Sequence, residues 1–179
     1  MIAVLLAEGF EEIEALLPVD MLRRAGLNVK TVGITGKTVT GSHGIPVIAD
    51  MLPDELPLSE ITLAIFPGGM PGALNLDASP FTDKVIEAVK KNGARLAAIC
   101  AAPLVFGRRG LLDGKEATCY PGFEGELRGA RVLSAPVVTD GLITTAKGMG
   151  AALEFSKELL KLTVGEKTKN KLSAAIMEE

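Results

Sequence analysis

The chain has 179 residues, of which 47% are hydrophobic and 23% charged, and its net charge is −3; this profile predicts one globular domain over residues 1–179 and gives no excess of basic charge for nucleic acid. The longest uncharged stretch near the middle, residues 96–107, is too short to span a bilayer, so we expect no membrane association. Two cysteines do not make the disulfide framework of a secreted protein, and we expect a soluble protein of the reducing cytoplasm.

Strand and helix signals alternate along the chain. Continuous apolar runs mark strands buried on both faces, the first of them in place of a signal peptide, and amphipathic stretches closed by glycine mark helices. In chain order we expect a strand at 2–6, a helix at 11–25 that Pro18 should bend, a strand at 29–34, a hairpin over 36–50, a strand at 63–66, a helix between Ser79 and Gly93, a strand at 95–99, a helix from Ala101 to 107–110, strands at 117–120 and 131–133, a hairpin turning at 140–141, and helices at 151–162 and 166–178. This order predicts an α/β fold with a doubly wound, mostly parallel sheet, helices on both faces, and a site at the carboxyl ends of the strands.

The junction Ala97-Ala98-Ile99-Cys100-Ala101-Ala102-Pro103 has the pattern of a nucleophile elbow. The sharp turn of an elbow needs small residues two before and two after the nucleophile, and here these are Ala98 and Ala102. Cys100 would then lie at the amino end of a helix, where free N–H groups and the helix dipole lower the pKa of a thiol. The alternative is a buried, inert cysteine between alanines.

Two further strand-to-helix junctions are expected at the same edge of the sheet. In Phe66-Pro67-Gly68-Gly69-Met70-Pro71-Gly72, consecutive glycines would let backbone N–H groups approach a bound anion, unless they only form a tight turn. After the first strand, Glu14 shares a helix stripe with apolar residues, so its carboxyl should be partly desolvated and its pKa raised. It would then hydrogen-bond the thiolate or act as general base. The alternative is a solvated carboxylate that complements the helix amino terminus, as expected for Glu11 and Glu12.

Five blocks of sequence, in this order, together resemble the ThiJ/PfpI superfamily and specifically its DJ-one branch. They are LAEGFEEIE at 6–14, PVDMLRRAG at 18–26, FPGG at 66–69, AAICAAP at 97–103 and TDGLITT at 139–145. The resemblance covers almost the whole chain. It implies a flavodoxin-like domain, similar to the class I glutamine amidotransferases, and commonly a homodimer.

The resemblance also implies roles for individual residues. Cys100 would be the oxidation-sensitive nucleophile and Glu14 the carboxylic acid hydrogen-bonded to it, while Gly69 and Ala101 would offer the N–H groups of an anion site. Gly68 and Tyr120 are expected as neighbours of that site. Activities reported for the family include cofactor-independent glyoxalase, which converts methylglyoxal to lactate, and repair of glycated proteins or nucleotides. Oxidative-stress response and chaperone roles are reported as well.

This chain departs from the family pattern at its histidines. Human-like members carry a histidine near the thiol where this chain has Tyr120, and the peptidase branch has one directly after the cysteine, where this chain has Ala101. The only histidine, His43, falls at the tip of the expected hairpin, where we expect solvent exposure or a dimer contact. Cys119 is expected to be a buried thiol at a strand end. No ligand spacing is present, so we expect no metal site.

These observations favour a stress-response protein whose reactive cysteine, without a cofactor, acts on a small aldehyde or a glycated substrate and is itself oxidisable. The glyoxalase or deglycase reaction is the preferred activity. The alternatives are a redox sensor or chaperone without turnover, and a cysteine peptidase, which needs an imidazole near the thiol.

Overall fold

A six-stranded sheet forms the centre of the molecule in this computed structural model, which describes residues 1–177. The strands are β1 (Ile2–Leu6), β2 (Val29–Gly33), β5 (Leu63–Phe66), β6 (Arg95–Ile99), β9 (Val137–Asp140) and β10 (Ile143–Ala146). Their order across the sheet is β2-β1-β5-β6-β10-β9, and every neighbouring pair is parallel except β9 and β10. The predicted mostly parallel sheet and the flavodoxin-like strand order are therefore confirmed.

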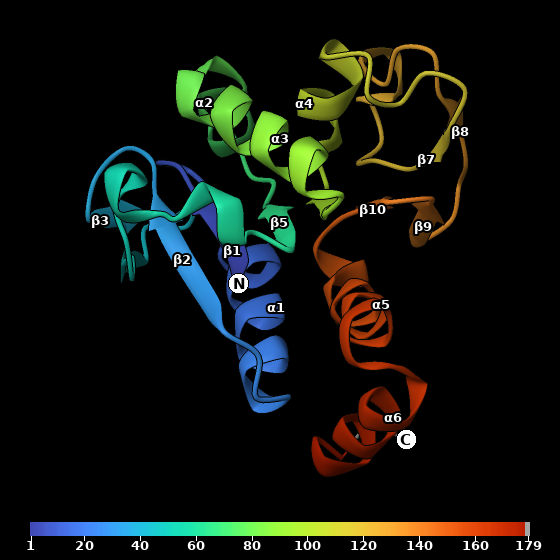
Figure 1. Cartoon of the computed structure of the whole chain (residues 1–179). Coiled ribbons are helices and arrows are strands. Elements are labelled where there is room, and N and C mark those ends of the chain that lie inside the picture. Colours follow the sequence, from blue (N-terminus) through green and yellow to red (C-terminus); the bar gives the residue numbers. More distant parts are fainter. Residues whose placement is uncertain (178–179) are drawn as a thin grey trace.

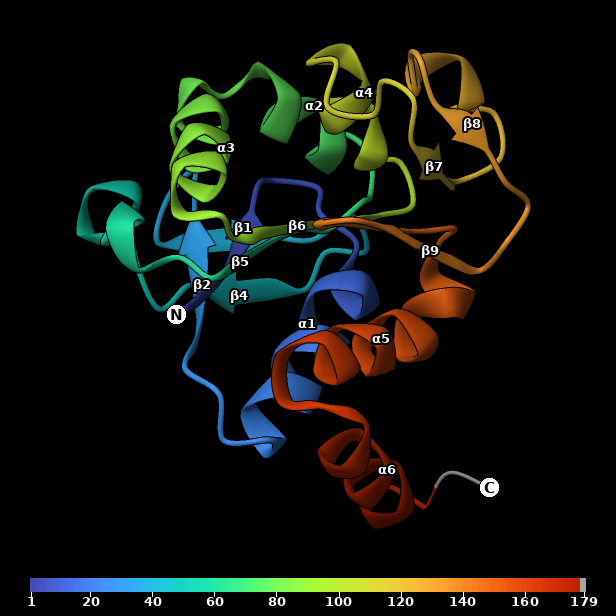
Figure 2. The same cartoon turned by 45° about the vertical axis from the view of Figure 1, so that its right-hand side comes forward.

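Helices cover both faces of the sheet, as Figures 1 and 2 show. On one face lie α2 (Gly72–Ala78), α3 (Pro80–Asn92) and α4 (Pro103–Arg108); on the other lie α1 (Glu12–Arg24), α5 (Ala152–Val164) and, beyond them, α6 (Glu166–Ala175). Short 3-10 turns occupy Pro53–Glu55, Leu58–Glu60, Glu124–Glu126 and Met149–Ala151. Two small sheets flank this body: the hairpin of β3 (Thr38–Thr40) with β4 (Pro46–Ile48), and the parallel pair β7 (Glu116–Ala117) with β8 (Arg131–Val132).

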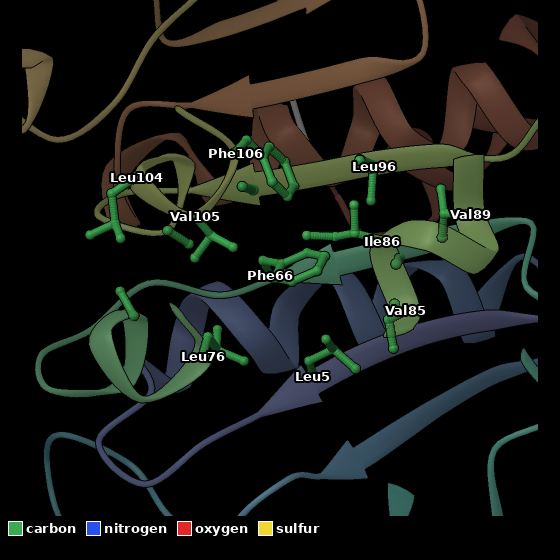
Figure 3. Packing of buried hydrophobic residues seen from close by; sticks show 14 of the residues in the cluster. Leu5, Phe66, Leu76, Val85, Ile86, Val89, Leu96, Leu104, Val105 and Phe106 are labelled. Carbon is green, nitrogen blue, oxygen red and sulfur yellow. The ribbon is translucent and has the colours of Figure 1, made fainter. Parts of the chain in front are cut away.

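The apolar run of β1 is continuous because its side chains enter two different cores. Leu5 belongs to the core beneath α2, α3 and α4, whereas Val4 and Leu6 belong to the core beneath α1 and α5. Figure 3 shows the first core, where the rings of Phe66 and Phe106 meet edge to face with centroids 5.1 Å apart. Both faces of a central parallel strand are covered, so no position on it can be polar at low cost.

Several boundaries follow from local chemistry that the sequence announced. The Ser79 hydroxyl accepts the Phe81 N–H at 3.3 Å at the start of α3, and Gly93 ends the helix with a φ of 62°. The expected hairpins at 36–50 and 140–141 are present. Helix α1 continues through Pro18, which removes one internal hydrogen bond without ending the helix.

Other boundaries differ from the sequence-based expectation. Helix α2 was not predicted, because proline and glycine around residues 67–72 indicate only a turn. The strands expected at 117–120 and 131–133 are two-residue strands, β7 and β8. Helix α4 begins at Pro103 and not at Ala101, since residues 100–102 form a turn. Residue 178 of the expected terminal helix lies outside the described residues, and α6 ends at Ala175.

Within residues 1–177, no helix has both the length and the apolar character needed to cross a membrane.

Candidate functional site

Three loops meet at the carboxyl edge of the sheet because β1, β5 and β6 are neighbours in it. The loop after β1 and the loop after β5 are tied together by the backbone. The Glu11 N–H donates to the Gly68 carbonyl at 2.9 Å, and the Gly72 N–H donates to the Gly9 carbonyl at 3.2 Å. The loop after β6 begins at Cys100. The three junctions that the sequence singled out therefore lie at one edge, as expected for an open α/β sheet.

Cys100 occupies a strained turn between β6 and α4. Its φ is 65°, a left-handed conformation that residues other than glycine rarely adopt. Two backbone bonds hold it there: the Cys100 N–H donates to the Ala146 carbonyl at 2.9 Å, and the Tyr120 N–H donates to the Cys100 carbonyl at 2.8 Å. The side chain is partly buried. This is the backbone geometry of a nucleophile elbow, with alanines giving the turn its room.

Glu14 faces this elbow from the first turn of α1. The residue is fully buried, and its Oε2 accepts the backbone N–H of Gly68 at 3.0 Å. Its Oε1 receives no hydrogen bond from the described residues. The thiol of Cys100 is the polar side chain that faces the carboxyl. A buried carboxyl with one unsatisfied oxygen next to a thiol is best satisfied by a proton between the two groups.

The two acids raise each other's pKa. Burial raises the pKa of Glu14 to about 7, although hydrogen bonds with Cys100 and Gly68 pull it down. Burial, followed by the charge of Glu14, raises the pKa of Cys100 to about 12, against the lowering effect of the Gly69 and Ala101 N–H groups. The predicted lowering of the Cys100 pKa is therefore wrong while Glu14 is ionised. The first reason is burial, and the helix whose dipole was invoked begins only at Pro103.

Gly68 and Gly69 are needed because the backbones approach closely. A side chain on Gly69, whose φ is 87°, would lie 2.5 Å from the Gly9 carbonyl oxygen and would collide with the Glu11 nitrogen. The same loop directs the Gly69 N–H toward the sulfur, as the Ala101 N–H is directed from the other side. Two N–H groups facing one sulfur form a small anion-binding position of the kind that the sequence predicted.

Tyr120 lies beside this position where a histidine was looked for. Its backbone touches Cys100, and its ring, half exposed, packs against Gly148. Together with Pro121, Pro136, Lys147 and Met149 it lines a cavity of about 470 Å³. Cys119, next to it, is 4% exposed, and burial raises its pKa to about 11. Cys119 is thus a buried thiol, as expected.

His43 lies in an environment that sequence reasoning missed. It is exposed at the hairpin tip, as expected, but its Nδ1 lies 3.1 Å from a Glu12 oxygen and 3.3 Å from a Glu11 oxygen. The pairing joins residues 31 positions apart, because the hairpin folds back onto the amino end of α1. Among the described residues, Glu11, Glu12 and His43 form a group able to hold a metal ion. The adjacent glutamates were the available signal.

Comparison with known proteins places these features in a wider group. The model of the DJ-1/PfpI family matches residues 1–162. The chain is 36% identical to protein DJ-1 homolog B of Arabidopsis thaliana over 96% of this chain and 40% of that protein. It is 29% identical to a deglycase of Pyrococcus abyssi over 90% of this chain and 98% of that protein. The structure of oxidized DJ-1 from Toxoplasma gondii, 31% identical, has a TM-score of 0.93 and covers 98% of this chain and 97% of that one. The chain spans less than half the length of the Arabidopsis relatives that it matches.

Proposed function

The chain belongs to the DJ-1/PfpI family, and on this premise we propose that it converts small α-oxoaldehydes such as methylglyoxal through Cys100, without a cofactor. One observation carries the proposal: the buried Glu14 carboxyl, anchored by the Gly68 N–H at 3.0 Å, faces the Cys100 thiol. A nucleophile beside a group that moves protons is the arrangement that this chemistry requires. The relative named as a deglycase supports a substrate of this class.

In the first step the Cys100 sulfur adds to the aldehyde carbon. A carbon–sulfur bond forms, the carbonyl electron pair moves to the oxygen, and that oxygen takes the proton held by Glu14, which gives a hemithioacetal. The N–H groups of Gly69 and Ala101 already face the sulfur, so they are close to the place where negative charge develops.

In the second step the ionised Glu14 removes the proton from the former aldehyde carbon and a proton returns to the neighbouring carbon. The ketone is thereby reduced to an alcohol, and the aldehyde carbon is oxidised to a thioester. Water then cleaves the thioester and releases lactate and the free thiol. Methylglyoxal and one water give one lactate, so no external oxidant or reductant enters the balance.

Lactate formation from methylglyoxal tests the proposal, and the protein should first be dialysed against a chelator. Cys100→Ser and Glu14→Gln should each lose the activity, because one removes the nucleophile and the other the proton carrier. Cys119→Ser is the matched control, since it replaces a buried thiol that has no role in the reaction. Unchanged lactate formation by Cys100→Ser would refute the proposal.

A redox sensor without turnover is the second candidate. It is favoured by exposure: Cys100 is partly exposed, whereas Cys119 is 4% exposed, and the N–H groups at Cys100 would also stabilise a sulfinate. Each of two peroxide molecules would give one oxygen to the sulfur and leave as water. Mass spectrometry after mild peroxide treatment should show two added oxygens on Cys100 and none on Cys119. Equal oxidation of both cysteines would contradict this candidate.

We also propose a homodimer, on the strength of the family membership alone. Sedimentation equilibrium should give the mass of two chains, and the mass of one chain at all concentrations would exclude it.

A further inference from the structure

Four ligand atoms converge at the amino end of α1, and from their arrangement we propose a binding site for a divalent cation of the zinc class. The atoms are the Oε2 oxygens of Glu11 and Glu12, the Oγ of Ser42 and the Nδ1 of His43. None of them belongs to the Cys100 site, so the inference is independent of the proposed function.

The distances between these atoms describe a tetrahedron. His43 Nδ1 is 3.3 Å from Glu11 Oε2 and 3.1 Å from Glu12 Oε2. Ser42 Oγ is 3.0 Å from Glu11 Oε2, 3.4 Å from Glu12 Oε2 and 3.1 Å from His43 Nδ1. The centre of a regular tetrahedron lies at about 0.61 of its edge from each corner. An edge of about 3.2 Å therefore places the centre about 2.0 Å from each atom, which is the length of a zinc–nitrogen or zinc–oxygen bond.

Hydrogen atoms alone do not account for these five contacts. The Ser42 hydroxyl supplies one hydrogen, His43 Nδ1 supplies at most one, and ionised carboxylates supply none. Even if each hydrogen is shared between two acceptors, one contact is left between lone pairs. A cation at the centre accepts an electron pair from all four atoms, and its two positive charges balance the two carboxylates.

The surroundings hold the ligands in this arrangement. The Glu12 side chain is only 5% exposed, and its Oε1 accepts the backbone N–H groups of His43 at 2.9 Å and Ile45 at 3.4 Å. These bonds direct Oε2 toward the centre, as outer partners do for metal-binding carboxylates. A side chain on Gly41 would collide with the Glu12 carboxyl, so the glycine is what lets the hairpin approach α1.

The ligand types and the size of the hole select the cation. An imidazole nitrogen with carboxylate oxygens suits zinc and other late first-row metals. Calcium takes six to eight oxygens at about 2.3–2.6 Å and magnesium demands an octahedron, so neither fits four atoms with a centre about 2.0 Å away. The His43 side chain is 68% exposed, which leaves a path from solvent.

Calorimetric titration of Zn²⁺ into the chelator-dialysed full chain tests the site. The titration should be run in Cys100→Ser protein, which cannot support the proposed reaction, so the two proposals fail separately. One equivalent should bind, and His43→Gln should weaken binding at least about tenfold. The matched control is Glu8→Gln: Glu8 accepts the Thr40 N–H of the same hairpin at 3.1 Å but supplies none of the four atoms. This variant should bind as the parent does.

Co²⁺ gives a second readout on the same samples. A tetrahedral nitrogen and oxygen site should give intense visible bands without the near-ultraviolet charge-transfer band that a cysteine ligand adds. If His43→Gln fails to fold, Glu11→Gln takes its place, since Glu11 lies at the start of α1 and its loss should weaken binding likewise. Absence of saturable Zn²⁺ binding, undiminished binding in either variant, or a thiolate charge-transfer band would each overturn the proposal.

Discussion

Gly68 and Cys100 lie so close that a methyl group on the glycine would sit 2.6 Å from the Cβ atom of Cys100. The same methyl group would sit 2.5 Å from Glu14 Oε2 and 2.9 Å from the Ile99 carbonyl oxygen. These distances are far below van der Waals contact. The absence of a side chain at Gly68 is therefore what allows the carboxyl and the thiol to face each other.

Gly68→Ala should separate the two acids. The methyl group must displace Glu14 or Cys100, so lactate formation should fall at least tenfold, and overpacking should cost about 1–3 kcal/mol of unfolding free energy. Urea unfolding and a lactate assay measure both effects. Gly125→Ala is the control, because no heavy atom lies within 4 Å of its added methyl group. Parental activity in Gly68→Ala would show that this spacing is not needed.

Glu14→Gln should abolish proton transfer while keeping the shape of the site. The glutamine can still accept the Gly68 N–H, but it cannot carry the proton, so the turnover rate should fall by about 10²–10⁴. Steady-state kinetics with methylglyoxal measure the change. Glu87→Gln on the exposed face of α3 should have the parental rate. An unchanged turnover rate in Glu14→Gln would remove Glu14 from the mechanism.

The alkylation rate of Cys100 should show a plateau with pH. The pair of acids loses its first proton near pH 7, where burial has placed the pKa of Glu14, and its second only near pH 12, where burial and the Glu14 charge hold Cys100. Between these values the pair keeps one negative charge, and its division between oxygen and sulfur is independent of pH. The rate should therefore rise through pH 7 and then level off.

Iodoacetamide kinetics in a Cys119→Ser background measure this profile, because that variant removes the other thiol. In Glu14→Gln the coupling is lost, and the plateau should disappear. A single rise centred at about 8.5, the pKa of free cysteine, would contradict the coupled pair.

Thr145→Val should destabilise the segment that carries Tyr120. The buried N–H of Thr118 donates to the buried Thr145 hydroxyl at 2.9 Å, and valine leaves that donor unsatisfied. The expected loss is about 1–3 kcal/mol of unfolding free energy, measured by urea denaturation. Thr38→Val, at an exposed strand position, is the control. Equal stability of the two variants would show that this bond contributes nothing net.

The sequence predicted best what depends on neighbouring residues. Apolar runs predicted the central strands, because a strand covered on both faces has no polar position. The alanines around Cys100 predicted the elbow, because its turn admits only small side chains. The apolar stripe that contains Glu14 predicted a raised carboxyl pKa, and burial does raise it.

What the sequence did not predict depends on contacts between distant segments or on the start of a helix. The approach of His43 to Glu12 is set by how the hairpin folds onto α1, and no periodicity records it. The high pKa of Cys100 follows from burial and from a carboxyl that arrives from another helix. Sequence patterns also did not distinguish the turn at 100–102 from the first turn of α4.

The left-handed backbone at Cys100, with its φ of 65°, has an evolutionary consequence. A residue other than glycine in this conformation costs about 1–2 kcal/mol, so Cys100→Gly should give a more stable protein that has lost its thiol. Natural selection for stability alone therefore favours glycine at this position. Only selection for what the sulfur does can keep a cysteine there, and lineages released from that selection should drift toward glycine.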